Sequence, residues 1–275
     1  MMSDAAATTS ERAADDLGPV HLERGGALAV LTLDSPPLNL FDRAMLDGLD
    51  DALGALVADP PRGLLIRADG RVVSGGVDVK SLVSRLEPAT AGPLFDQFLR
   101  LVRTLETLPL PTVFAAHALT LTAAFELALG CDLILAAEAA RFGLVEAVVG
   151  LTPAMGGTQR VVERAGPARA REIVYTGELF DAATLERWNV VNRVLPDEGF
   201  DEAARAFARR LAEGPTRAHA ATKAVVRAVL DNGTVLAGDR AVPSAVTPLL
   251  TSEDFRGAVA SFRERGPGHA DFEGR

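Results

Sequence analysis

The sequence contains only one cysteine, Cys131, among its 275 residues. A single cysteine excludes an intrachain disulfide and a cysteine-rich zinc module, and it is typical of a protein from a reducing compartment. The four histidines lack the spacing of metal ligands. We therefore expect a cytoplasmic protein that uses neither a disulfide nor a bound metal.

Positive charge is also scarce. The chain has 28 lysines and arginines against 37 aspartates and glutamates, which gives a formal net charge of −9. Phosphate contacts require clustered lysine and arginine, so this balance argues against a general nucleic-acid binder. It stays compatible with a small anionic ligand that is held by a local basic patch.

Long apolar runs are missing as well. A membrane-spanning helix needs about 20 consecutive apolar residues, and the longest candidate, Ala118 to Ala137, is interrupted by Glu126 and Asp132. The N-terminal segment MMSDAAATTSERAADD has neither the basic region nor the apolar region of a signal peptide. We expect no membrane association.

Strand-like and helix-like apolar patterns alternate over most of the chain. A hairpin is predicted over residues 20–33, and strand–turn–helix units follow it, which indicates an α/β fold. The predicted strands span residues 63–66, 112–116, 132–137 and 190–194. The predicted helices span residues 41–56, 93–108, 122–130, 157–165, 167–176 and 181–187, and a further helix begins within 78–84.

The same patterns divide the chain into three parts. Residues 1–18 are rich in small and acidic side chains and are predicted to form a flexible tail. Residues 19–196 are predicted to form the α/β core, and residues 197–275 a helical C-terminal region. The helices expected in that region span 200–212, 216–230, 234–249 and 252–264.

Two glutamates stand in apolar surroundings. Glu126 lies in LTAAFELAL and Glu146 in FGLVEAVVG, and no basic residue occurs between His117 and Arg141. Burial moves the pKa of a carboxyl group toward neutral pH, where it serves general acid–base catalysis. Structural roles are open too, because Glu126 could interact with a helix dipole and Glu146 could be a solvated turn residue.

Two glycine pairs mark candidate ligand contacts. SGGVDVK, residues 74–80, allows a sharp turn before a helix whose free amides could bind an oxyanion or a phosphate. PAMGGTQR, residues 153–160, could bring a ligand close to a helix start. Ordinary strand-to-helix turns and close packing are the alternatives at these positions.

Residues 123–160, AAFELALGCDLILAAEAARFGLVEAVVGLTPAMGGTQR, resemble the signature stretch of the enoyl-CoA hydratase/isomerase family, the crotonases. SGGVDVK and the segment TSEDFRGAVASFRERGPG extend the resemblance over about residues 20 to 265. It implies a spiral of ββα units, with C-terminal helices that assemble homotrimers, often paired into hexamers. It also implies an acyl-CoA substrate and no separate cofactor, since coenzyme A enters as part of that substrate.

The resemblance also assigns roles to particular residues. Glu126 and Glu146 match the two catalytic glutamates of the hydratases, with Glu126 deprotonating water and Glu146 delivering a proton to the α-carbon. The backbone amides of Val77 and Ala123 match the two donors to the thioester oxygen. The residues that would contact coenzyme A or the substrate are Asp78, Val79, Lys80, Arg263 and Arg265.

One departure concerns the oxyanion donors. The family pattern N-G-x-x-x-G-G-G reads His117-Ala-Leu-Thr-Leu-Thr-Ala-Ala124 here, and Val77 replaces the usual alanine. The added methyl groups predict a tighter pocket, and alanine disfavours any positive φ that glycine accepts. Isomerisation, decarboxylation or carbon–carbon cleavage of an acyl-CoA, and acyl-CoA binding without turnover, are therefore alternatives to hydration.

Overall fold

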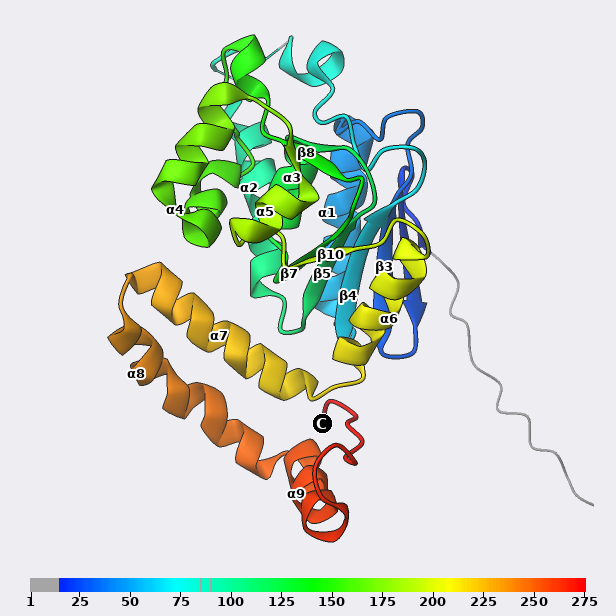
Figure 1. Cartoon of the computed structure of the whole chain (residues 1–275), viewed down its shortest axis with the longest axis vertical. Helices are drawn as coiled ribbons and strands as arrows, with labels where there is room; N and C mark the ends of the chain where they lie inside the picture. The colour runs from blue at the N-terminus through cyan, green and yellow to red at the C-terminus, as the bar shows by residue number, and fades with distance from the viewer. Residues whose placement is uncertain (1–14, 85, 90) are drawn as a thin grey trace, which may run out of the picture.

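A seven-stranded sheet forms the centre of the protein (Figure 1). The computed structural model describes residues 15–84, 86–89 and 91–275. The strands, in their spatial order, are β1 (Asp15–Asp16), β2 (Val20–Gly25), β3 (Leu28–Leu33), β4 (Gly63–Ala68), β5 (Thr112–Ala116), β7 (Leu133–Ala137) and β10 (Arg193–Leu195). β1, β2 and β3 are antiparallel neighbours, and every pair from β3 to β10 is parallel.

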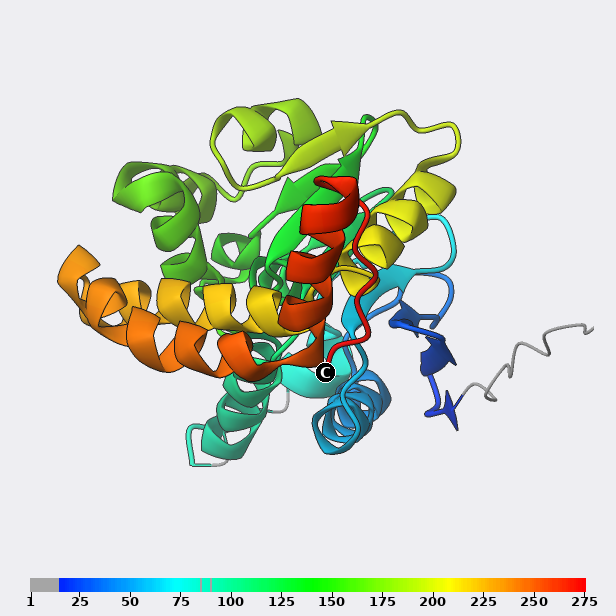
Figure 2. The ribbon, with the colours of Figure 1, turned by 90° about the horizontal axis from the view of Figure 1, so that it is seen from below.

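Helices cover both faces of this sheet, which explains why its central strands are continuous apolar runs. β3 and β5 are buried at every position. α1 (Arg43–Ala58) and α2 (Ala91–Thr107) pack together, and α1 contacts β2. α6 (Phe200–Ala212) packs on β3, β4 and β5 from the face opposite α1 (Figures 1 and 2).

A second, small sheet places the two glutamates. Its strands are β6 (Thr120–Leu121), β8 (Arg141–Gly143) and β9 (Phe180–Asp181). β6 and β8 are parallel, with Leu121 opposite Gly143, so the segments that follow them leave the sheet at the same end. These segments are the helix α3 (Ala123–Leu129), which carries Glu126, and the 3-10 helix η2 (Glu146–Val149).

The remaining helices form two groups. α4 (Gly157–Thr176) follows η2 and is kinked at Gly166, where φ is 81° and ψ is 166°; α5 (Ala182–Arg187) comes next. α7 (Thr216–Asn232), α8 (Val235–Val246), the 3-10 helix η3 (Thr247–Thr251) and α9 (Glu253–Arg265) lie beside the core as a separate layer (Figure 1). Thr216 and Gly238 are the buried residues of α7 and α8.

The structure corrects three details of the sequence prediction. Most of the expected tail, residues 1–14, lies outside the described residues, but Asp15 and Asp16 pair with β2. The last predicted strand falls at Arg193–Leu195 instead of residues 190–194. The reason is that the backbone amides of Val190 and Val191 donate hydrogen bonds to the Leu185 carbonyl at the end of α5. The helix expected within residues 78–84 is the single-turn π-helix η1 (Val79–Val83). None of the helices in the described ranges combines the length and apolarity that a bilayer crossing requires.

Candidate active site

Glu126 is buried at the first turn of α3 and is held by backbone amides. Its side chain is 2% exposed. Its Oε2 accepts hydrogen bonds from the amides of Met155, at 2.9 Å, and Gly157, at 2.6 Å. A Cβ on Gly157 would lie 2.8 Å from the Glu126 Cγ, so the glycine permits this approach. The second glycine pair of the sequence thus packs against the first candidate glutamate.

Glu146 begins η2 and is half-buried. Its Oε2 is buried and finds no hydrogen-bond partner among the residues that the structure describes. A buried polar atom without a partner in the protein calls for an explanation. A water molecule or a substrate atom would supply the missing partner. The Glu146 carboxyl group can therefore contact a bound molecule.

Burial raises the pKa of both carboxyl groups. The pKa of Glu126 rises to about 8 through burial and through the negative charge of Glu146. The hydrogen bonds from the backbone amides of Gly157 and Met155 oppose this rise. Burial raises the pKa of Glu146 to about 7. The two carboxyl groups therefore interact, and both can exchange protons near neutral pH, as general acid–base catalysis requires.

An ion pair supports the segment that holds Glu126. The guanidinium of Arg160 in α4 donates from Nε and Nη2 to the two carboxylate oxygens of Glu106 in α2, each at 2.7 Å. Its Nη1 donates to the Gly156 carbonyl at 2.9 Å. Gly156 has a φ of 103° and stands between Met155 and Gly157, so this contact fixes the two amides that bind Glu126.

Val77 and Ala123 meet at Thr122. Ser74 and Thr120 form a parallel bridge, which places Val77 beside Thr122. The Val77 amide donates to the Thr122 Oγ1 at 3.2 Å. Ala123 is the first residue of α3, so its amide has no acceptor within the helix.

The backbone conformation at this corner corrects one expectation. The positive φ is at Thr122, which has φ 45° and ψ −115°, and Ala123 is helical. A β-branched residue in this region is an outlier that costs about 1–3 kcal/mol. Thr122 therefore adopts a backbone conformation that glycine would adopt more easily.

The remaining candidate residues lie at different distances from the two glutamates. Asp78 caps η1, because its Oδ1 accepts from the amides of Lys80, at 3.0 Å, and Ser81, at 3.3 Å; the Ser81 bond lowers the Asp78 pKa. Val79 and Lys80 are exposed. Arg263 and Arg265 lie on α9, at the opposite end of the molecule from α3 (Figure 1). The structure does not bring these arginines to the glutamates of the same chain.

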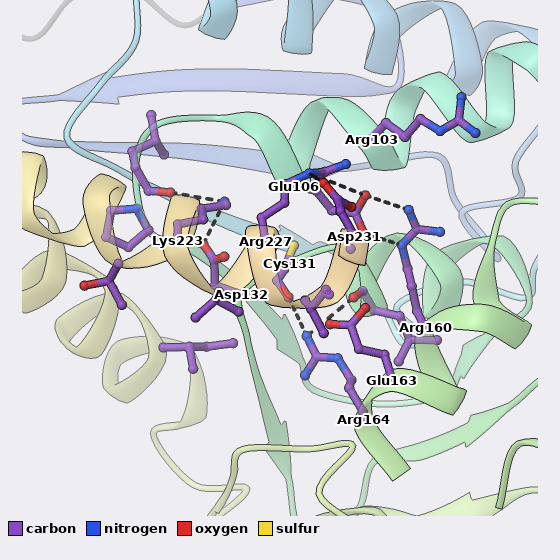
Figure 3. A pocket seen from close by; sticks show the side chains of 18 of the residues that line it. Arg103, Glu106, Cys131, Asp132, Arg160, Glu163, Arg164, Lys223, Arg227 and Asp231 are labelled. Carbon is purple, nitrogen blue, oxygen red and sulfur yellow. Dashed lines mark hydrogen bonds and ion pairs between the residues drawn. The ribbon is translucent and has the colours of Figure 1, made fainter. Parts of the chain in front are cut away.

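A large cavity lies elsewhere, between α7 and the core (Figure 3). Its volume is about 830 Å³, and neither Glu126 nor Glu146 lines it. Asp132 accepts hydrogen bonds there from the Thr112 amide at 2.8 Å and from the Lys223 Nζ at 2.9 Å. Burial raises the pKa of Cys131 to about 12. The hydrogen bond between Lys223 and Asp132 fastens α7 to the core.

Within the described ranges, no group of three or more histidine, cysteine, aspartate or glutamate side chains is placed to hold a metal ion.

Residues 23–275 match the profile of a family described as enoyl-CoA hydratase/isomerase. The chain is 33% identical to a carnitinyl-CoA dehydratase of Salmonella typhimurium, over 90% of this chain and 95% of the relative. It is 31% identical to a probable enoyl-CoA hydratase of Mycobacterium bovis, over 76% of this chain and 81% of the relative. The crystal structure of an enoyl-CoA hydratase subunit I from Geobacillus kaustophilus superposes with a TM-score of 0.87 at 30% identity, covering 95% of this chain and 100% of that chain. The expected crotonase fold is confirmed.

Proposed function

The chain belongs to the enoyl-CoA hydratase/isomerase family, and we propose that it is a hydro-lyase that adds water across the double bond of a 2-enoyl-CoA thioester. The observation that carries this proposal is the pair of interacting carboxyl groups, of which Glu126 is buried and Glu146 half-buried. Glu126 has a pKa of about 8 and Glu146 one of about 7. Hydration requires one group that takes a proton from water and one that gives a proton to carbon.

The contacts of the two glutamates support a division of labour. A proton on Glu146 would remove the negative charge that, after burial, contributes most to the raised pKa of Glu126. Two amides bind Oε2 of Glu126 and favour its ionised form, whereas the Glu146 Oε2 has no such donor among the described residues. Glu126 then takes the proton of the attacking water, and Glu146 protonates the α-carbon.

Negative charge builds up on the thioester oxygen as water attacks the β-carbon. The corner formed by Val77, Thr122 and Ala123 supplies hydrogen-bond donors for this charge. One such donor is worth about 3 kcal/mol of transition-state stabilisation. Proton transfer and water addition require no redox cofactor, and coenzyme A is part of the substrate.

The C-terminal helices support self-association into a trimer or a hexamer. They expose large apolar side chains that one copy of the chain leaves uncovered. These residues are Val226, Leu230, Val235, Leu236, Val242, Val246, Leu250, Phe255, Val259 and Phe262. In such an assembly, Arg263 and Arg265 would contact the coenzyme A that is bound to a neighbouring copy. Lys80 would contact the coenzyme A that is bound to its own copy.

Functions other than hydration stay possible, because Thr122 fills space that glycine leaves free in the family pattern. Isomerisation, decarboxylation or carbon–carbon cleavage of an acyl-CoA would use the same corner, as would acyl-CoA binding without turnover. Crotonyl-CoA separates these functions. A loss of enoyl-thioester absorbance with a product heavier by one water supports hydration. Binding of the ester without such a product rejects hydration.

A further inference from the structure

The Thr122 hydroxyl lies beside the amide of one candidate oxyanion donor, Val77, and Thr122 directly precedes the other, Ala123. The Thr122 Oγ1 accepts from the Val77 amide at 3.2 Å. The fit is close, because a Cβ on Gly76 would collide with this hydroxyl. An oxygen atom of the protein thus stands beside the Val77 amide, where the substrate oxygen was expected.

This hydroxyl still has a hydrogen to donate. A threonine hydroxyl carries one donor and two acceptor positions, and the bond from Val77 uses one acceptor position. Thr122 is 8% exposed, and no described residue accepts a hydrogen bond from its hydroxyl. A buried donor without an acceptor is unusual, and the oxygen of a bound ligand would satisfy it.

We propose that Thr122 is a catalytic residue whose hydroxyl donates a hydrogen bond to the thioester oxygen of the substrate. The Val77 amide donates to Thr122 in turn, and the Ala123 amide is the second direct donor. The proton stays on Thr122 throughout. This inference rests on the proposed hydration of an enoyl-CoA.

The physical reason lies in the existing bond. If the substrate oxygen approached the Val77 amide directly, the 3.2 Å contact would have to break and the threonine side chain would have to leave a closely packed place. Donation through the hydroxyl keeps this contact. Hydrogen bonds in a chain polarise one another, so the Val77 amide makes the Thr122 hydroxyl a better donor. Hydroxyl side chains are among the groups that stabilise oxyanions.

The kinetic test compares Thr122→Val, which keeps the shape and removes the hydroxyl, with Thr122→Ser, which keeps the hydroxyl. Thr122→Val should lower kcat for crotonyl-CoA about 100-fold, the effect of losing one oxyanion donor, and Thr122→Ser should recover most of it. Thr120→Val is the matched control, because Thr120 is buried two positions away and donates to the Ala118 carbonyl. Thr122→Ala serves as a second variant without the hydroxyl if Thr122→Val does not fold.

The result that would overturn the inference is equally direct. If Thr122→Ala hydrates crotonyl-CoA at the wild-type rate or faster, the hydroxyl merely fills the site in the free protein, and the substrate displaces it.

A second readout does not require turnover. The carbonyl stretching frequency of bound butyryl-CoA, a saturated thioester that cannot be hydrated, should fall on binding to the wild type and to Thr122→Ser, and should fall less on binding to Thr122→Val. Equal shifts in all three proteins would reject the role of Thr122 and leave hydration standing. Wild-type binding and carbonyl polarisation without any hydration would reject the proposed function and still support the donor role. Failure of the wild type to bind either ester would overturn both.

Discussion

The carboxylate of Glu126 accepts a hydrogen bond from the Gly157 amide at 2.6 Å, across 31 positions of sequence. This distance depends on the missing side chain of Gly157, since a Cβ there would stand 2.8 Å from the Glu126 Cγ. The relationship links the start of α4 to a buried acid on α3. It makes the second glycine pair part of the candidate active site.

Replacing Gly157 with alanine should therefore displace Glu126. We expect Gly157→Ala to lower kcat about 100-fold, because a displacement near 1 Å has that effect on a positioned group. Overpacking should also lower the free energy of unfolding by about 1–3 kcal/mol. Gly54→Ala is the control, because Gly54 lies on the exposed face of α1 and a Cβ there meets nothing within 4 Å. Steady-state kinetics and urea unfolding of both variants test this, and wild-type kinetics in Gly157→Ala would contradict it.

Arg160 is expected to position Glu126 without touching the substrate. Arg160→Lys loses the paired bonds to Glu106 and the bond to the Gly156 carbonyl, because an ammonium cannot reproduce the planar fork. We expect kcat to fall on the order of tenfold, with an altered pH profile, because the segment whose amides position Glu126 loses part of its support. Arg205→Lys is the control, because its bond to Asp201 is exposed on α6. An unchanged kcat and pH profile in Arg160→Lys would show that Arg160 only contributes packing.

Stability should depend on pH through the buried pair. Burial raises the Glu126 pKa from 4.5 to about 8, so between these values the folded chain binds more protons than the unfolded chain. This contribution is fully present below pH 4.5 and is lost as the pH rises to about 8, which lowers the free energy of unfolding on the order of 1–4 kcal/mol. Glu126→Gln should have a flatter profile in urea unfolding between pH 5 and 8. Parallel profiles for the two proteins would contradict the burial of an ionisable group at this position.

The sequence was most informative where the signal was local. Glu126 and Glu146 stood out because their neighbours are apolar, and the structure confirms that burial raises the pKa of both. Helices with clear apolar spacing were predicted within a few residues, as α1 and α6 show. The fold followed from family motifs that cover most of the chain.

The missing parts depend on contacts between distant segments. The bond from Val77 to Thr122 joins residues 45 positions apart, and the pair of Arg160 and Glu106 spans 54 positions. No periodicity or composition reports such a contact. The threonine that replaces a family glycine was visible, but its positive φ and its hydrogen bond required coordinates.

The central claim is that Glu126 and Glu146 together add water to an enoyl-CoA. The most direct measurement incubates crotonyl-CoA with the wild type, Glu126→Gln and Glu146→Gln in water labelled with heavy oxygen, and follows the product by mass spectrometry. The wild type should yield the hydrated thioester with one labelled oxygen. Each variant should bind the ester but lose at least about 100-fold in kcat, since proton transfer by a positioned group contributes that much or more. An unlabelled or unchanged ester with the wild type, or wild-type rates in either variant, would contradict the account.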